Sequence, residues 1–457
     1  MRPDNFYFGG GATQTVLHPI VLVAMLLGII LILVLPRKYV MIPLLSIAFL
    51  SPQGQEILFL GFHFFVLRIL ILTGCVRMAL ARFRSSARIL VGGFTSLDTA
   101  FLLWATFRAL AFILLYLDPG AAVNRFAFLW DALGGYFVLR FLIQDQKDIN
   151  RVLKCFAVFA VILAACMVNE QLTGHNVFGV LGGARTVAEI RYGRIRSQAT
   201  FAHPLLAGAW AGTAFPLFVL LWKFGRARFL SLAAMVSCAV MVVTSATSTS
   251  ILALGAGIVG LLFWPFRKHM RAIRWALVLG VLALHLVMHA PVWYLISHID
   301  LTGGSSSYHR AVLIDQFIRN FGDWWLLGTK SNASWGADMW DTINQYVQEG
   351  EDGGLATLVC FLAMIVISFR WLGKARKAVQ GDRRKELYYW ILGATLFAHT
   401  IGYFGISYFD YTRLAWYALL CMISAATLTV VRKPISPEMR TSFSPDSMPT
   451  VKVASMC

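Results

Sequence analysis

Three arginines and a histidine stand just ahead of an apolar segment, in a pattern suited to binding an anion. Arg191, Arg194 and Arg196 precede His203, which is followed by Pro204 and a long apolar run. The planar guanidinium group binds phosphate oxygens in pairs, and the free N–H groups in the first turn of a helix attract anions. We therefore predict that the three arginines and the histidine bind a phosphate group of a lipid-borne substrate. The alternative is contact with phospholipid headgroups.

A second set of candidate residues lies in the acidic segment 297–352. Arg310 could stabilise the negative charge on a departing phosphate. His309, Asp341 and Glu349 are candidates for the general base that takes the proton of an attacking hydroxyl group, although on a helix Glu349 would not share a face with Asn344. Asn344 could bind a sugar hydroxyl or a diphosphate oxygen, and its alternative role is to cap a helix. The competing interpretation of the carboxylates is that they are solvated loop charges.

The elements that would position these residues are apolar helices. The chain has 457 residues, of which 58% are hydrophobic and 14% are charged, whereas soluble domains carry about 25% charged residues. We predict an all-α, polytopic integral membrane protein with about 12–13 transmembrane helices, because apolar runs of roughly 20 residues recur along the chain. They form a single membrane domain over residues 1–433. The expected spans are 16–35, 39–50, 57–80, 95–116, 125–143, 151–168, 203–222, 228–244, 250–266, 275–296, 353–372, 385–405 and 411–431.

The distribution of charge predicts the topology and argues against a nucleic-acid partner. The net charge is +18, but the basic residues lie in alternate connectors, as the positive-inside rule describes. The basic connectors and the tail 434–457, which we expect to be disordered, then face the cytoplasm. The long loops 169–202 and 297–352 face the opposite, periplasmic side. Membrane lipids are expected to contact the basic connectors.

The remaining polar residues have structural roles in this interpretation. The cysteines lack metal-binding and redox spacing, so we expect no metal site. Asp131 is expected to pair with Arg108 or Arg140, because unpaired charge inside a membrane is costly. The segments 308–321 and 338–350 are expected to form short interfacial helices.

Several of these motifs together resemble the O-antigen ligase and O-antigen polymerase superfamily. The similarity is carried by a large outer loop and by two segments, Arg196-x6-His203-Pro204 and Asn344-x9-Gly354-x-x-Thr357. It is strongest over residues 125–373. The resemblance implies a fold like that of the C-type glycosyltransferases. It also implies transfer or polymerisation of glycans carried on undecaprenyl diphosphate, at the outer face of the bacterial inner membrane.

The same resemblance sets expectations for cofactors and partners. Members of the superfamily work without a metal or other cofactor, in O-antigen or exopolysaccharide assembly. We therefore expect an undecaprenyl-diphosphate-linked oligosaccharide as the substrate, and other polysaccharide-assembly proteins as partners.

The chain departs from the family pattern at two places. The family's motif histidine, its proposed catalytic base, is Ile343 here, and isoleucine cannot exchange a proton. Residues 244–250 lack the arginine of a Ser-Arg-Gly-like segment, although their hydroxyl groups could line the same place. The missing histidine favours a polymerase over a ligase.

Two alternative functions remain open. Ionisable residues within the spans would suit a secondary transporter or flippase of lipid-linked sugars, although paired Gly/Pro interruptions in matching halves are not evident. Ile343 would suit a non-catalytic scaffold of a polysaccharide-assembly complex.

Overall fold

The computed structural model describes residues 14–59, 61–84, 89–298, 306–409 and 411–431. The protein is 75% helical, and within these ranges the strands form two short hairpins. The expected all-α class is thereby confirmed. The tail 434–457 and residues 299–305 of the loop 297–352 lie outside the described residues.

Five helices in the described ranges are long and apolar enough to cross a membrane. They are α4 (Ser96–Tyr116), α7 (Gln146–Thr173), α8 (Pro204–Phe224), α11 (Met270–Val287) and α14 (Gln345–Ala378). Three others are apolar but have only 16, 17 and 15 residues: α1 (Pro19–Val34), α9 (Arg228–Thr244) and α10 (Ser248–Leu262). These helices are consistent with an α-helical membrane protein. They are fewer than the roughly 12–13 spans expected, since several apolar runs form short or interrupted helices.

The remaining helices and helical turns complete the chain. They are α2 (Arg37–Leu50), α3 (Val66–Arg84), α5 (Pro119–Leu129), α6 (Gly135–Leu142), α12 (Ser306–Arg319), α13 (Phe321–Trp324), α15 (Arg383–Gly402), α16 (Tyr411–Val431), the π-helical turn η1 (Trp130–Gly134), and the 3-10 turns η2 (Val177–Leu181), η3 (Trp264–Lys268), η4 (Val292–His298) and η5 (Ala333–Trp335). The expected span 125–143 is therefore α5, η1 and α6 in series. It begins earlier, at Pro119, because the Asp118 carboxylate caps the first turn.

Two β-hairpins occur where the sequence predicted a membrane span and a loop. β1 (Glu56–Phe59) pairs with β2 (Phe62–Phe65), so the first part of the expected span 57–80 is wrong. β3 (Glu189–Arg191) pairs antiparallel with β4 (Arg194–Arg196) inside the expected loop 169–202. Strands of three or four residues are too short to show a clear alternation of polar and apolar residues.

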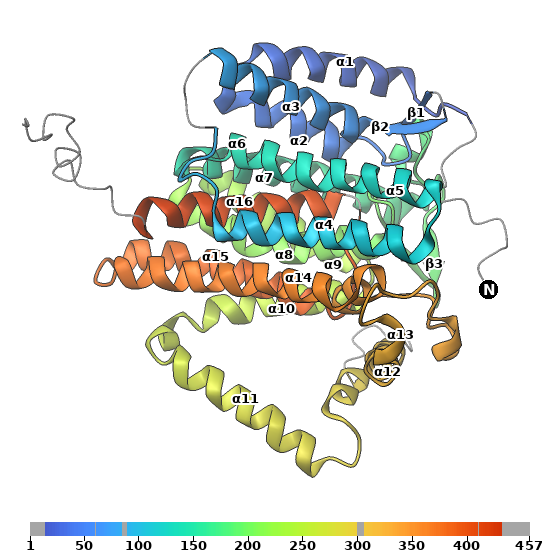
Figure 1. Cartoon of the computed structure of the whole chain (residues 1–457). Helices are drawn as coiled ribbons and strands as arrows, with labels where there is room; N and C mark the ends of the chain where they lie inside the picture. The colour runs from blue at the N-terminus through green and yellow to red at the C-terminus, as the bar shows by residue number, and fades with distance from the viewer. Residues whose placement is uncertain (1–13, 60, 85–88, 299–305, 410, 432–457) are drawn as a thin grey trace, which may run out of the picture.

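The helices lie side by side in a bundle, with both hairpins, α12 and α13 at one end (Figure 1). α4 packs along α14, α8 packs against α9 and α10, and α10 packs against α15. The buried core is apolar and includes the rings of Phe49, Phe156 and Trp210, which contact one another. Packing in this core holds the helices in place, and it thereby positions the helix ends and hairpins at one end of the bundle.

Charged residues inside the bundle form ion pairs, but not the pair expected. Asp131 pairs with Arg68 at 3.0 Å, and not with Arg108 or Arg140. The reason is that η1, which carries Asp131, packs against α3, which carries Arg68. Arg140 pairs instead with Asp98 at 3.4 Å, and both side chains are fully buried.

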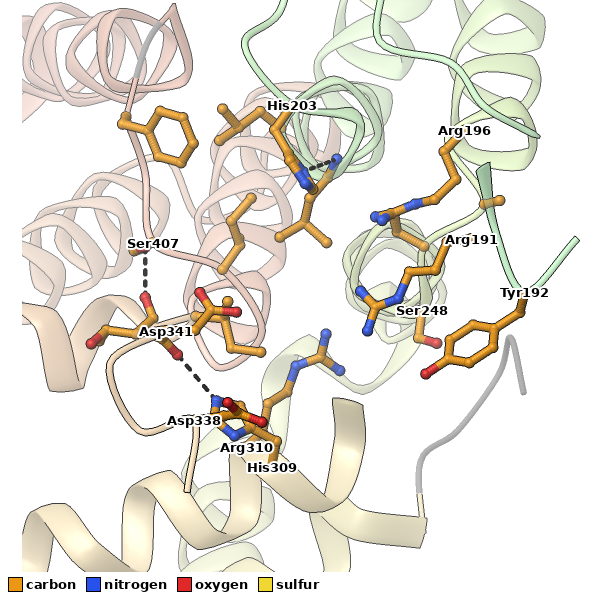
Figure 2. A pocket seen from close by; sticks show the side chains of 18 of the residues that line it. Arg191, Tyr192, Arg196, His203, Ser248, His309, Arg310, Asp338, Asp341 and Ser407 are labelled. Carbon is orange, nitrogen blue, oxygen red and sulfur yellow. Dashed lines mark hydrogen bonds between the residues drawn. The ribbon is translucent and has the colours of Figure 1, made fainter. Parts of the chain in front are cut away.

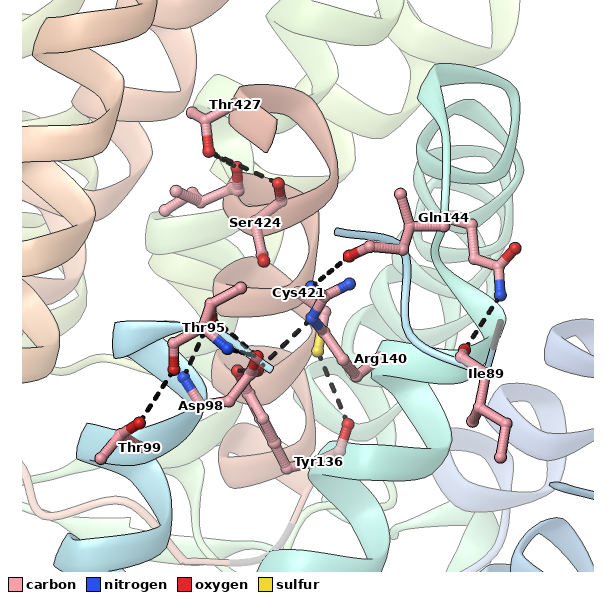
Figure 3. Close-up of polar contacts among 12 residues, drawn as sticks. Ile89, Thr95, Asp98, Thr99, Tyr136, Arg140, Gln144, Cys421, Ser424 and Thr427 are labelled. Atoms are coloured by element: carbon pink, nitrogen blue, oxygen red, sulfur yellow. Dashed lines mark hydrogen bonds and ion pairs between the residues drawn. The ribbon is translucent and has the colours of Figure 1, made fainter. Parts of the chain in front are cut away.

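Asp98 and Arg108 show how such buried charges tie helices together. The Asp98 carboxylate accepts hydrogen bonds from the Thr95 N–H at 2.8 Å and from the Tyr136 hydroxyl at 2.7 Å (Figure 3). It thereby caps α4 and joins it to α6. The Arg108 guanidinium pairs with Glu349 at 2.8 Å and also with Asp352, which joins α4 to α14.

α14 contains a kink at Gly354. Gly354 has a φ of 70°, and a Cβ there would lie 2.5 Å from the carbonyl oxygen of Leu326. The next residue, Leu355, donates its N–H to the carbonyl of Trp325 at 2.8 Å. Glycine is therefore required both by the left-handed backbone and by the close approach of the segment after α13.

One of the two segments expected to form interfacial helices is a helix in the structure. The segment 308–321 corresponds to α12. The first half of the expected helix 338–350 is wrong, because residues 338–344 form a turn and an extended segment; residues 345–350 are the start of α14.

α11 stands apart from the rest of the bundle (Figure 1). None of its residues is buried, and it contacts η3 and η4 at its two ends. Exposed apolar side chains occur all around it: Trp275, Leu277, Val278, Leu279, Val281, Leu282 and Leu284. A helix that is apolar on every face suits an apolar solvent such as lipid.

Candidate functional site

A cavity of about 510 Å³ opens at the hairpin end of the bundle (Figure 2). Its walls come from the β3–β4 hairpin, the start of α8, the turn between α9 and α10, the first turn of α12, the segment before α14 and the link between α15 and α16. The polar lining residues are Arg191, Tyr192, Arg194, Arg196, His203, Thr247, Ser248, His309, Arg310, Asp338, Trp340, Asp341, Thr342 and Ser407. Segments that lie more than a hundred residues apart in the sequence thus meet in one place.

The β3–β4 hairpin places three arginines on one wall of the cavity. Arg191 lies opposite Arg194, and Glu189 lies opposite Arg196. Because side chains alternate along a strand, these four side chains share one face of the hairpin. The turn between the strands, Tyr192–Gly193, has φ angles of 51° and 71°. Positive φ angles at both central residues are typical of the type I′ turn, which matches the twist of the two strands in a two-residue hairpin.

Arg196 and His203 are held by Glu189. Arg196 is 5% exposed, and its Nη1 donates to Glu189 Oε1 at 2.6 Å. Burial lowers the pKa of Arg196, and the Glu189 carboxylate partly offsets this effect. His203 Nε2 lies 3.5 Å from Glu189 Oε2.

His203 is also the N-cap of α8. Its Nδ1 accepts a hydrogen bond from the Leu205 N–H at 3.1 Å, which fixes Pro204 and the first turn. Burial lowers the pKa of His203 to about 4, and the neighbouring arginines lower it further while Glu189 opposes them. The ring is therefore neutral at pH 7. Since Nδ1 is an acceptor, the proton is on Nε2, toward Glu189.

The opposite wall carries Arg310 and His309, both on the first turns of α12 (Figure 2). Arg310 is 6% exposed, and its Nη2 donates to Thr249 Oγ1 at 2.8 Å. The Thr249 hydroxyl donates in turn to the carbonyl of Gly405 at 3.0 Å. The hydroxyl-rich segment 244–250 therefore holds Arg310 through Thr249, while its neighbour Ser248 lines the cavity.

His309 contacts Asp341, but at the main-chain carbonyl of Asp341 and not at its carboxylate. His309 Nε2 donates to the main-chain carbonyl of Asp341 at 3.1 Å. The exposed side chain of Asp341 lines the cavity. Ile343 also lines the cavity and supplies no group that exchanges protons.

Of the residues predicted for the site, Asn344 and Glu349 lie outside the cavity lining, and the Glu349 carboxylate pairs with Arg108. The Asn344 side chain accepts hydrogen bonds from the N–H groups of Tyr346 at 2.9 Å and Val347 at 3.3 Å, and it is 1% exposed. It caps α14, which is the alternative role that the sequence offered. The other seven predicted residues line the cavity.

Several residues of the site were not predicted from the sequence. Glu189 could have been found, because Glu-Ile-Arg and Arg-Ile-Arg flank a Tyr-Gly pair and this alternation is typical of a hairpin. Asp338, Trp340 and Ser407 carry no comparable local signal, since only the packing of distant segments brings them to the cavity.

The described residues contain no group of three or more His, Cys, Asp or Glu side chains placed to hold a metal ion. The site is thus a basic, hydroxyl-lined cavity at one end of an all-α bundle whose apolar helices are consistent with a membrane protein. No family model matches the chain, and no curated protein matches it.

Proposed function

We propose that the protein is a multi-pass glycosyltransferase of the bacterial inner membrane. In this proposal it polymerises or transfers undecaprenyl-diphosphate-linked glycan units at the periplasmic face, in exopolysaccharide or O-antigen assembly. The observation that carries the proposal is the convergence of Arg191, Arg194, Arg196 and Arg310 on one cavity. Four guanidinium groups from two opposed walls suit a ligand with several phosphate charges.

The chemistry requires a leaving group and a base. The acceptor hydroxyl forms a bond to the anomeric carbon of the donor sugar, while the bond from that carbon to the diphosphate oxygen breaks. The arginines stabilise the charge that develops on the departing diphosphate. The hydroxyl proton passes to a carboxylate, for which Asp341 is the candidate because its side chain is exposed in the cavity. His309 is the second candidate, although its Nε2 proton is engaged by the Asp341 carbonyl.

The test is glycan synthesis by purified protein in lipid nanodiscs, supplied with a lipid-diphosphate-linked oligosaccharide. Arg196→Ala and Arg310→Ala should each lower turnover by about 100-fold or more, as removal of a charge-stabilising donor does. The matched control is Arg319→Ala, because Arg319 is on α12 with Arg310 but is 67% exposed and pairs with Asp315. Full product formation by both cavity variants would overturn the proposal.

A non-catalytic scaffold is the second candidate function, and Ile343 in the cavity wall favours it. A scaffold would bind a lipid diphosphate, such as the soluble probe farnesyl diphosphate, through the same arginines but would form no product. Binding measured together with turnover in the same nanodiscs therefore separates the two functions.

A further inference from the structure

A second cavity, also of about 510 Å³, lies between the β3–β4 hairpin and the neighbouring ends of α7, α9 and α10. Its volume is within the range of pockets that bind small molecules. Its apolar lining includes the branched side chains of Ile195, Val242, Val243 and Ile251, and Arg194 alone carries a charge among its described lining residues. The second cavity is thus mainly apolar, in contrast to the basic cavity that holds the four arginines.

The two cavities are neighbours. Arg194 and Ala246 line both of them, so the hairpin and the turn between α9 and α10 form their common border. An arginine suits such a border, because its apolar stem packs well against hydrocarbon while its charged head stays in polar surroundings. A single ligand with an anionic head and an apolar chain can therefore reach into both cavities.

The second cavity continues into an apolar helix face. Val243, which lines it, is 74% exposed, and the exposed side chains of Val236, Leu232 and Phe229 follow along α9. Their spacing matches the helical repeat, so these four side chains lie on one side of α9. In the proposed membrane this face contacts the hydrocarbon of the lipid. A chain can thus pass from the bilayer into the second cavity without crossing water.

We propose that the second cavity binds the hydrocarbon chain of a lipid diphosphate whose phosphate groups occupy the basic cavity. This inference rests on the proposed function, since it assumes a diphosphate ligand, and it adds the place of the chain. The chain enters sideways along α9, and the head group passes Arg194 to reach the other arginines. A water-soluble donor, such as a nucleoside diphosphate sugar, would leave the apolar cavity unused. The pair of cavities therefore favours a lipid-borne donor.

The chain contributes most to binding when it comes from water, because a bilayer is already as apolar as the cavity. The test therefore compares two water-soluble probes with the same diphosphate and the same charge: geranyl diphosphate and methyl diphosphate. Their dissociation constants are measured on the full-length protein in nanodiscs of neutral lipid. Empty nanodiscs give the fraction of geranyl diphosphate that enters the bilayer. We expect the native protein to bind geranyl diphosphate about 100-fold more tightly than methyl diphosphate.

Ile251→Trp places a bulkier side chain in the second cavity. It should lower the ratio of the two dissociation constants about tenfold and change the affinity for methyl diphosphate by less than about twofold. The matched control is Ile258→Trp, because both isoleucines are 37% exposed and lie on one face of α10, about two turns apart, whereas Ile258 is outside the lining of either cavity. The control should leave both affinities within about twofold of the native values. If Ile251→Trp does not fold, Val243→Trp replaces it, because Val243 is largely exposed and lines the same cavity.

A second measurement locates the chain. A geranyl diphosphate analogue with a diazirine near the end of its chain should label residues 242–251 on irradiation. Excess methyl diphosphate should abolish this label, because it competes for the head-group site. A label that persists under this competition would show that the probe behaves as surrounding lipid, and it would overturn the inference.

The outcomes separate the inference from the proposed function. Equal affinity of the native protein for both probes, or equal ratios in the native protein and Ile251→Trp, would overturn the inference alone. Native protein that binds neither probe would overturn the proposed function as well. Competed labelling of residues 242–251 without glycan synthesis in the turnover assay would support the chain site and overturn the proposed transferase.

Discussion

The two buried arginines of the cavity are held in different ways, and the difference is testable. Arg196 is held by a carboxylate, whereas Arg310 is held by the hydroxyl of Thr249. Thr249→Val keeps the volume and removes that hydroxyl, and it also leaves the Gly405 carbonyl without its donor. We expect about a tenfold loss of turnover, the size of one hydrogen bond to a charged group. Thr249→Ser, which restores the hydroxyl, should recover most of the activity, and equal activity of Thr249→Val and the native protein would contradict this role.

His203 predicts a dependence of stability on pH. Its pKa is lowered to about 4 in the folded protein, whereas a histidine in an unfolded chain titrates near 6.5. Between these values the unfolded chain binds a proton that the folded chain does not, so stability falls as the pH drops from about 6.5 to about 4. The effect should be about 1 kcal/mol after a discount for solvent screening, because 36% of the side chain is exposed.

The measurement is the unfolding temperature across this pH range in detergent. His203→Asn keeps a residue type favoured at helix N-caps and removes the titrating group. The variant should show a shallower pH slope than the native protein, and identical slopes would remove His203 as the cause.

The candidate site was predictable at the residue scale where charge stood out against its surroundings. Arg191, Arg194 and Arg196 were conspicuous because positive charge is unusual in a loop that is expected on the outer side. The sequence left two roles open for Asn344, because an asparagine before an apolar helix has the same local sequence whether it binds a ligand or caps the helix. Asp338 and Trp340 reach the cavity through the path of a loop, which no short motif specifies.

At the scale of elements, the kink in α14 depends on a single glycine. Gly354→Ala would require a left-handed alanine and would place its Cβ 2.5 Å from a backbone oxygen. We expect a loss of at least about 2 kcal/mol in the free energy of unfolding. Gly373→Ala in the same helix is the control, because a Cβ there meets nothing within 4 Å and alanine favours a helix. Equal unfolding temperatures for the two variants would show that the kink is not needed.

The helices could be predicted because a long apolar run forms a helix more readily than any other regular structure. The hairpins were not. In 56–65 the strands are rich in phenylalanine and leucine and continue directly into α3, so the whole stretch reads as one apolar run. In 189–196 charged and apolar residues alternate, but each strand has only three residues, so the segment was interpreted as a charged loop. Both hairpins are fixed by pairing across a turn.

At the scale of the whole molecule, Arg108 links two long helices through buried charge. Arg108 and Glu349 are 2% and 0% exposed. Arg108→Ala would leave the carboxylates of Glu349 and Asp352 without their partner, and we expect a loss of about 3–5 kcal/mol. Arg68→Ala is the comparison, since Arg68 and Asp131 are 20% and 35% exposed and their pair should contribute about 1 kcal/mol or less. Similar losses for both variants in detergent unfolding experiments would contradict this ranking.

The isolation of α11 has a mechanical consequence if the chain spans a bilayer as we propose. Its neighbour η4 is bonded to α12, where the Trp293 indole N–H donates to Asp315 at 3.2 Å, and α12 carries Arg310. A helix that packs on its neighbours η3 and η4 near its ends adjusts its tilt to the thickness of the surrounding hydrocarbon. A change in bilayer thickness that tilts α11 would therefore displace η4 and α12, and with them the side chain of Arg310. Turnover in vesicles of graded acyl-chain length should pass through a maximum. The same turnover at every chain length would show that the tilt of α11 does not affect the cavity.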